Sequence, residues 1–532
     1  MKTRNDPSGP RSESAIVIGA GAGGLAAAID LARAGLNVTV FEAAGEAGGK
    51  IHQAAAPNTI NSDGADTALM DAGPTVFTMR WIFEDLFSDA GADLDASLEL
   101  TGADILARHA WRDGDRLDLF ADQQKSADAI AAFAGPDDAA GYLRFCEESA
   151  DIFETLREPF IMGQRPSHLD VVRRVGLLNM PSFIRHIKPT QTLWTALKRH
   201  FNDPRLRQLF GRYATYVGSS PFLTPATIML VAHVEQDGVW AVKGGMKAVA
   251  AAMQKLAERQ GATFQFNAPV SEIIVENGAA VGVRLKNGEE TRADVVIFNG
   301  DASALGQGLL GAPARKSAKA LPTKKRSLSA VTYCLHAEAK GFPLAFHNVF
   351  FGGDYEREFN AVFKQRTITD DPTVYLCAQD RAHGESSASP NADKKERLFL
   401  LINAPADGDK HDNGVDVERI TENVAKLLGA CGLDIGLSTD TARIATPTDF
   451  HRRFPASGGA LYGQTCHGMT ATMARAGAKT PLPGLYLAGG SVHPGAGVPM
   501  ATMSGRLAAA AYFDDRGRRV VSTPAPATSA SS

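Results

Sequence analysis

Three glycines near the start of the chain have the spacing that binding of a dinucleotide requires. Gly19, Gly21 and Gly24 form a GxGxxG pattern, and Glu42 follows 23 residues after the first of them. The first glycine allows a sharp turn, the second lets the backbone approach a pyrophosphate, and the third allows a helix to pack close to a strand. A carboxylate at Glu42 can accept hydrogen bonds from ribose hydroxyls. These residues therefore predict a dinucleotide cofactor.

The elements that would position these residues surround them in the sequence. Residues 15–18 form an apolar run with the length of a buried parallel strand, and 38–41 predict a second strand. Between them, 25–34 are rich in Ala and Leu and predict a helix that ends near Gly35. Such a unit places the glycine turn at the N-terminus of the helix, whose free N–H groups attract phosphates.

A second set of residues favours FAD over NAD. Two clusters follow Glu42 in the sequence: Gly48, Gly49 and Lys50, and then Gly73, Pro74 and Thr75. A glycine pair after the acidic residue resembles the extended fingerprint of the glutathione-reductase-like flavoprotein superfamily, in which it continues the pyrophosphate cradle. An ordinary loop would also explain the pair, but the resemblance implies FAD.

The far end of the chain carries matching signals. Residues 485–488 predict another buried strand, and a Gly- and Pro-rich segment with five candidate cofactor residues follows it: Gly489, Gly490, Gly497, Val498 and Pro499. We expect a helix from Met500 to about Tyr512, with Pro499 in its first turn. The partial positive charge of its N-terminus suits a flavin ring that gains negative charge. A turn that only caps a structural helix is the alternative.

The middle of the chain supplies further parts of the same domain. We predict a helix over 247–259, strands over 263–266, 269–275 and 281–285, and a buried strand over 293–299. Asn-Gly turns at 277–278 and 287–288 separate some of these strands. A crossover helix, a three-stranded meander and a return strand are standard in the superfamily that the fingerprint resembles. That resemblance makes Val270 a candidate for contacting the adenine through its backbone.

Composition restricts the class of protein. The 532 residues include 55 Lys and Arg and 59 Asp and Glu, so the formal charge is −4, which excludes a globally basic nucleic-acid binder. The five cysteines are widely spaced without a CxxC motif, so we expect no metal site, no disulfide framework and a cytoplasmic location. We find no apolar run of about 18 residues that would span a bilayer, and the polar residues 1–13 do not resemble a secretory signal.

The region 120–238 has a different character, with few strand signals and many helix-compatible stretches. Its part 169–201 mixes basic residues such as Arg173 and Arg185 with apolar residues such as Leu178 and Trp194. A basic amphipathic surface of this kind suits the headgroup layer of a membrane. An ordinary solvated pair of helices over a core would give the same pattern.

Taken together, these segments resemble the bacterial carotenoid (phytoene-type) desaturases over about residues 15–512. The most specific stretch is 484–499, and support comes from 71–75, 244–245, 347–351 and 454–463. The resemblance implies FAD, a long isoprenoid or carotenoid substrate, and peripheral attachment to the inner (cytoplasmic or photosynthetic) membrane. Detailed likeness in 490–505 favours the late-acting branch, the 1-hydroxycarotenoid 3,4-desaturases that act on hydroxyneurosporene or methoxyneurosporene.

The predicted fold is a mixed α/β architecture with a discontinuous, Rossmann-like FAD-binding domain. We assign residues 14–80, 239–303 and 480–516 to that domain. A mixed-sheet substrate domain takes 81–119 and 304–479, and a helical lid that faces the membrane takes 120–238. Residues 1–13 and 518–532 are expected to be disordered tails, since the second is rich in Ser, Ala, Thr and Pro.

The expected chemistry is removal of two hydrogens from adjacent carbons, one of them as hydride to the flavin. The candidates for a catalytic base are His347, Tyr333 and Arg144, and each has an ordinary structural role as its alternative. No second nucleotide fingerprint occurs, so oxygen or a quinone is the expected electron acceptor. A phytoene desaturase, an amine oxidase-like enzyme, a carotenoid isomerase and a non-catalytic prenyl-lipid escort protein are the competing functions.

Overall fold

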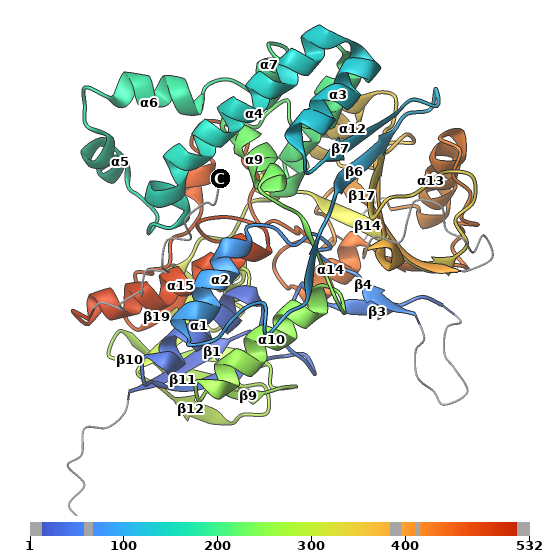
Figure 1. Cartoon of the computed structure of the whole chain (residues 1–532). Helices are drawn as coiled ribbons and strands as arrows, with labels where there is room; N and C mark the ends of the chain where they lie inside the picture. Colours follow the sequence, from blue (N-terminus) through green and yellow to red (C-terminus); the bar gives the residue numbers. More distant parts are fainter. Residues whose placement is uncertain (1–12, 58–67, 383–394, 411–414, 519–532) are drawn as a thin grey trace, which may run out of the picture.

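A five-stranded parallel sheet joins three distant stretches of the chain in the computed structural model, which describes residues 13–57, 68–382, 395–410 and 415–518 (Figure 1). Its strands, in spatial order, are β19 (Leu485–Leu487), β13 (Val295–Phe298), β1 (Ser14–Ile18), β2 (Asn37–Phe41) and β9 (Thr263–Gln265). These five strands confirm the predicted ones to within two residues. The expected tails, 1–13 and 518–532, lie outside the described residues except at their inner ends.

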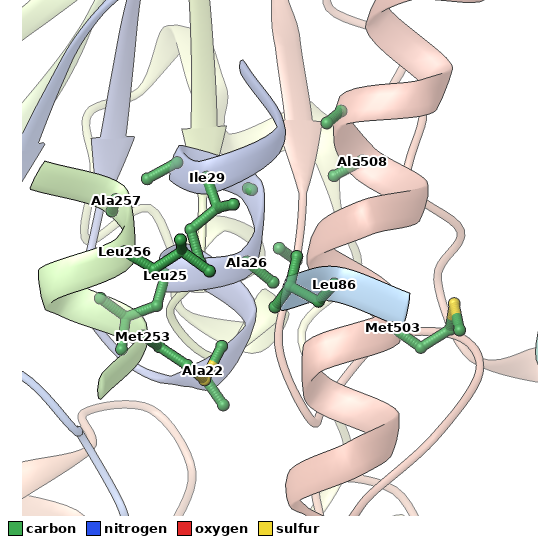
Figure 2. Close-up of a cluster of buried hydrophobic side chains, with 14 of the residues drawn as sticks. Ala22, Leu25, Ala26, Ile29, Leu86, Met253, Leu256, Ala257, Met503 and Ala508 are labelled. Carbon is green, nitrogen blue, oxygen red and sulfur yellow. The ribbon is translucent and has the colours of Figure 1, made fainter. Parts of the chain in front are cut away.

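Helix α1 (Ala22–Arg33) lies between α10 (Met246–Arg259) and α15 (Val498–Asp515) against this sheet (Figure 2). The predicted helices at these places are confirmed. Helix α2 (Arg80–Asp89) adds Leu86 to the same core (Figure 2). This helix falls mostly within the range 81–119 that the sequence predicts as part of the substrate domain, and its apolar face is buried against α1 and α15.

A three-stranded meander lies beside the parallel sheet. It consists of β10 (Val270–Glu276), β11 (Ala279–Leu285) and β12 (Glu290–Arg292), all antiparallel. Two of its strands confirm those predicted over 269–275 and 281–285. Its third strand, β12, was not predicted, whereas the strand predicted over 263–266 belongs to the parallel sheet as β9. Two short ribbons connect the parts of the molecule: β3 (Gln53–Ala55) with β4 (Leu69–Asp71), and β5 (Leu100–Gly102) with β8 (Trp240–Val242).

A seven-stranded mixed sheet forms the second body of the molecule. Its strands, in spatial order, are β18 (Arg443–Ala445), β14 (Ser329–Ala337), β17 (Glu396–Ala404), β16 (Val374–Ala378), β15 (His347–Phe350), β6 (Ile105–Ala110) and β7 (Arg116–Phe120). The pair β15 and β6 is parallel and the other pairs are antiparallel. Helix α13 (Val417–Ala430) packs its apolar side on this sheet. Shorter helices adjoin the two sheets: α11 (Ala302–Gln307), α12 (Tyr355–Asn360) and α14 (Pro447–Arg453).

Helices dominate the region between β7 and β8, as the sequence predicts. They are α3 (Gln123–Ala134), α4 (Pro136–Leu156), α5 (His168–Val175), α6 (Met180–Ile187), α7 (Leu193–Leu197), α8 (Pro204–Gly211) and α9 (Leu230–Gln236). Helices α5 and α6 project from one side of the molecule (Figure 1). Within the described ranges, we find no helix that combines the length and the apolar character needed to cross a bilayer.

Candidate functional site

The predicted glycine turn lies between β1 and α1, where a cofactor phosphate would meet the helix. Gly19 has a φ of +96°, a conformation that glycine adopts without strain. A Cβ atom on Gly24 would lie 2.0 Å from the carbonyl oxygen of Gly19, so this position admits no larger residue without a backbone shift. Gly21 caps α1 without a side chain. The first N–H groups of the helix therefore remain available to an anion.

The second glycine pair lies directly beside this turn. The N–H of Gly48 donates to the carbonyl oxygen of Ala20 at 2.9 Å, and Gly48 forms a parallel bridge with Gly21. Gly49 has a φ of +60°, and a Cβ atom there would lie 3.2 Å from the Cα atom of Gly21. The two clusters thus form one backbone cradle that is free of side chains, which fits the pyrophosphate of FAD.

Glu42 lies buried at the end of β2 and closes the cradle. Its Oε2 accepts a hydrogen bond from the N–H of Ala20 at 2.7 Å, and its Oε1 accepts one from Ala44 at 2.8 Å. Each carboxylate oxygen keeps a further lone pair that can serve a ribose hydroxyl. The carbonyl oxygen of Glu42 accepts from the N–H of Ala268, which brings the start of β10, where Val270 lies, to this end of the sheet.

Sequence reasoning missed Asn299, which organises the same turn. Its Nδ2 donates to the carbonyl oxygen of Gly19 at 3.1 Å. Its amide group also occupies the space beside Gly23 and Gly489, where an added Cβ would approach Oδ1 to less than 3.0 Å. Its position directly after the buried strand β13 could have identified Asn299 as a candidate site residue, because ligands of open α/β sheets bind at the carboxyl ends of the strands.

The Gly-rich segment after β19 completes the cradle from the other end of the chain. The N–H of Gly489 donates to Oγ of Ser504 at 2.7 Å, and the carbonyl oxygen of Gly490 accepts from Nη1 of Arg475 at 3.1 Å. Helix α15 starts after Gly497, with Val498 and Pro499 in its first turn. A Cβ atom on Gly505 would lie 1.9 Å from the carbonyl oxygen of Gly23, so α15 and α1 cross in close backbone contact.

The segment 71–75 joins the cradle to the second body of the molecule. The carboxylate of Asp71 accepts the N–H of Met246 at 2.6 Å and so holds the start of α10. An added Cβ on Gly73 would lie 2.0 Å from the carbonyl oxygen of Lys50. The Nζ of Lys50 donates to the carbonyl oxygen of Leu461 at 2.6 Å, and burial lowers the pKa of this ammonium group.

One cavity of about 670 Å³ reaches from these cofactor segments into the helical region. Gly73, Pro74 and Thr75 line one part of it, together with Gly497, Val498 and Pro499. Apolar side chains from α5, α6 and α9 and from the seven-stranded sheet form most of the remaining wall. A volume of this order accommodates a small-molecule ligand, and a wall of this kind favours an apolar one.

A hydrogen-bonded chain of three polar side chains, Thr75, Tyr375 and His347, lies at the cavity wall; Thr75 and His347 are buried and Tyr375 is partly buried. Oγ1 of Thr75 lies 2.7 Å from Oη of Tyr375, and that oxygen lies 2.7 Å from Nδ1 of His347. Burial, helped by the positive charge of Arg212, lowers the pKa of His347 to about 3. The imidazole is therefore neutral at neutral pH. His347 is thus the one of the three base candidates that connects to the cavity.

The structure does not bring the other two candidates to this site. Tyr333 is buried on the side of the seven-stranded sheet that α13 covers, and Oγ1 of Thr421 in that helix lies 3.3 Å from its hydroxyl. Burial raises its pKa to about 12. Arg144 is exposed on the outer side of α4. Neither residue lines the cavity.

Sequence reasoning also missed a buried charged cluster on the cavity wall. The Nη1 of Arg212 donates to the hydroxyl of Tyr216 at 3.0 Å. Glu235 accepts hydrogen bonds from the hydroxyls of Tyr213 at 2.6 Å and Tyr216 at 2.7 Å. Arg212 and Tyr216 line the cavity. Arg212 directly follows α8 and Glu235 lies in the last turn of α9. The two residues are far apart in the sequence, so only folding brings them together.

Comparison with known proteins agrees with this geometry. The family described as flavin containing amine oxidoreductase matches residues 22–512. Hydroxyneurosporene desaturase of Rubrivivax gelatinosus is 48% identical over 518 residues, which cover 96% of each chain. A 1-hydroxycarotenoid 3,4-desaturase of a Flavobacterium species is 29% identical over 93% of this chain and 98% of that protein.

Among solved structures, an oxidoreductase from Methanosarcina mazei superposes with a TM-score of 0.56 and covers 93% of this chain and 99% of its own. Its sequence identity of 16% supports the fold alone. The family match and the 48% identity extend over nearly the whole chain. The chain therefore belongs to the flavin containing amine oxidoreductase family and, within it, to the FAD-dependent carotenoid desaturases.

Proposed function

We propose that this desaturase introduces the C-3,4 double bond into acyclic carotenoids that carry a hydroxyl group at C-1, such as 1-hydroxyneurosporene. The observation that carries the proposal is the cavity of about 670 Å³ whose wall combines the cofactor segments with apolar side chains. The names of its relatives supply the substrate class and the position of the new bond. The sheet order and the two glycine clusters further support placing the cofactor domain in the glutathione-reductase-like superfamily.

The cradle residues would hold FAD, with the pyrophosphate at Gly19, Gly21, Gly24, Gly48 and Gly49. Bound FAD supplies the oxidant, which takes one substrate hydrogen as hydride while the other leaves as a proton. The N-terminus of α15 contributes partial positive charge to the cofactor end of the cavity. The apolar wall aligns the polyene and excludes water from the reacting carbons.

The departing proton needs an acceptor, and His347 with Tyr375 offers one through the polar chain at Thr75. In the described part of the chain, no Asp or Glu lines the cavity. A neutral imidazole with a pKa of about 3 is a weak base. It suffices here because positive charge that develops beside a conjugated polyene makes the neighbouring C–H strongly acidic. Oxygen or a membrane quinone then accepts the electrons.

The segment 167–188, which contains α5 and α6, is the proposed contact with the membrane. It presents Leu177 and Leu178 to solvent with 78% and 97% of their surfaces exposed, and Arg173 and Arg185 are exposed near them. Its other side lines the cavity through residues such as Val172 and Phe183. A lipophilic substrate could therefore pass from the bilayer into the cavity without crossing water. The attachment is peripheral and suits the inner membrane.

Lys188 ends this segment and ties it to the body of the molecule. Its Nζ forms an ion pair with Glu148 of α4. Burial raises the pKa of Glu148, but hydrogen bonds from His200 and Lys188 outweigh that effect and lower it to about 2. The ion pair therefore keeps α6 close to α4 at neutral pH, with the apolar side of α6 on the cavity.

Product analysis of the FAD-loaded enzyme tests the function. Liposomes that contain either 1-hydroxyneurosporene or phytoene are incubated with the protein, and the carotenoids are separated and their absorption spectra recorded. We expect a red-shifted product that is two hydrogens lighter from the hydroxylated substrate. Turnover of phytoene alone would favour a phytoene desaturase. Turnover of amines would favour an amine oxidase. A product of unchanged mass would favour an isomerase, and binding of prenyl lipid without turnover would favour an escort protein.

A further inference from the structure

Two charged side chains lie on the cavity wall among the described residues, and they differ in how their donors are used. Arg475 donates to the carbonyl oxygens of Gly490, Tyr462 and Gln464 at 2.7 to 3.1 Å. It therefore acts as a brace for the surrounding loops. Arg212 makes no comparable set of bonds, although only 7% of its surface is exposed.

The guanidinium of Arg212 is held in place but is not fully hydrogen bonded. Its Nη1 donates to Tyr216, while its Nη2 lies 3.6 Å from Oε1 of Glu235, an ion-pair distance beyond hydrogen-bond range. Within the part of the chain that the structure describes, Nε and Nη2 have no hydrogen-bond partner. Buried donors of a charged group are costly when they stay unpaired. Because Arg212 lines the cavity, a cavity ligand is the candidate acceptor for these donors.

A second unpaired polar group lies on the same wall. Tyr355 is buried and lines the cavity, and its hydroxyl has no hydrogen-bond partner among the described residues. The charge of Arg212 acts on Tyr355 and on His347, so the three groups share one electrostatic environment. A hydroxyl can donate and accept, whereas a guanidinium only donates. The two residues together offer this wall of the cavity the donors and the acceptor that a ligand hydroxyl needs.

We propose that Arg212 and Tyr355 form the receptor for the C-1 hydroxyl of the carotenoid. This inference rests on the proposed function and assigns the residues that distinguish a hydroxylated end group from a hydrocarbon one. The hydroxyl oxygen accepts from Arg212, and its hydrogen is donated to Tyr355. A hydrocarbon end group would leave Nε and Nη2 of Arg212 and the hydroxyl of Tyr355 without a hydrogen-bond partner in a dry pocket. The reacting carbons lie two and three bonds from the carbon that bears the hydroxyl, so anchoring that group also fixes which bond faces the cofactor.

The test compares 1-hydroxyneurosporene with neurosporene, which lacks the hydroxyl, as substrates of the FAD-loaded enzyme in liposomes. We expect the wild-type enzyme to prefer the hydroxylated substrate in kcat/KM. Tyr355→Phe should reduce this preference by about 3- to 10-fold and Arg212→Met by about 10- to 100-fold, the usual ranges for neutral and charged hydrogen bonds. The loss should fall on the hydroxylated substrate, and activity on neurosporene should persist in Tyr355→Phe.

Tyr355→Phe is the safer variant, because the hydroxyl that it removes has no partner in the described protein. Tyr142→Phe is the matched control. Tyr142 is buried but does not line the cavity, and its hydroxyl donates to Oε1 of Gln236 at a distance of 3.0 Å. This variant should leave the preference unchanged. An unchanged preference in both Tyr355→Phe and Arg212→Met, at full FAD content, would overturn the receptor. So would an equal loss on both substrates.

Two further outcomes separate the receptor from the function on which it rests. A wild-type enzyme that desaturates both carotenoids equally would overturn the receptor and leave the desaturase function intact. A wild-type enzyme that desaturates neither would reject the proposed function. In that case, binding of the two carotenoids is measured by quenching of tryptophan fluorescence. If the wild type binds the hydroxylated compound more tightly than neurosporene and Tyr355→Phe removes this difference, the receptor is still supported. Equal binding of the two compounds by the wild type would overturn it.

Discussion

Substitution of two glycines in the same turn should separate loss of FAD from loss of fold. Gly21 has an extended backbone, with φ of −74° and ψ of 173°, that any residue can adopt. A Cβ atom there would approach Nδ2 of Asn299 to 3.1 Å and would lie 4.0 Å from the carbonyl oxygen of Gly48, an ordinary van der Waals contact. We therefore expect Gly21→Val to fold. Its side chain would occupy the place of the pyrophosphate, so FAD should not be retained.

Gly24→Ala should behave differently because the clash lies within the protein. Its Cβ atom would lie 2.0 Å from the carbonyl oxygen of Gly19, so one of the two backbones must move by about 1 Å to reach an acceptable distance. Both are held, Gly19 by Asn299 and α1 by its close contact with α15. Overpacking of this kind costs about 1–3 kcal/mol or more. Gly24→Ala should therefore lower the stability even of the protein without FAD.

Flavin absorbance of the purified proteins and thermal melting with and without added FAD distinguish the two effects. Ligand at 100 times its Kd stabilises a protein by about 2.7 kcal/mol, so the wild type should melt higher with FAD. Gly21→Val should melt like the FAD-free wild type and show no response to FAD. Stoichiometric flavin in Gly21→Val, or a normal melting temperature for FAD-free Gly24→Ala, would refute the reasoning.

Three more predictions follow from the site and its surroundings. The pKa of His347 is about 3, so this residue stays neutral over the usual assay range. A plot of kcat/KM against pH should therefore show no inflection near pH 6.5. An inflection there in the wild type that is absent in His347→Gln would contradict the structure. The lowered pKa of Glu148 makes its ion pair with Lys188 stabilising above about pH 4.3, the ordinary value for Glu, and this contribution is lost as the pH falls towards 2. The difference in melting temperature between the wild type and Glu148→Gln should therefore be full at pH 6 and shrink at pH 3; a constant difference would disprove the assignment. Leu178→Asp should reduce cosedimentation with anionic liposomes, whereas Leu309→Asp, on an exposed leucine outside the 167–188 segment, should not; equal binding of both variants would contradict the docking surface.

The cofactor half of the site could be predicted from the sequence because its signals are local. Gly19, Gly21 and Gly24 lie within six residues, and the physical reasons for each glycine apply to any turn of that shape. The structure shows the same steric requirement, above all at Gly24, where an added Cβ atom would clash with the carbonyl oxygen of Gly19. The second pair, Gly48 and Gly49, could be connected to the first because the fingerprint extends along one continuous segment.

The substrate half could not be predicted in the same way. Tyr333 and Tyr375 lie on strands of one sheet whose two faces are both covered, so alternation alone does not tell which face meets the cavity. Tyr333 faces α13, while Tyr375 reaches Thr75. The packing of α2 against α1 and α15 could not be predicted for a related reason, since an amphipathic helix does not reveal which core it joins.

The order of the elements along the chain has a consequence for biosynthesis. The strands β2 and β19 belong to one sheet, yet about 440 residues separate them. At a translation rate of about 5–20 residues/s, roughly 20 to 90 s pass between their emergence from the ribosome. During that interval the nascent nucleotide crevice lacks β19 and α15. The crevice is therefore completed only after α15 has been made, and until then the face of α1 that packs on α15 stays uncovered.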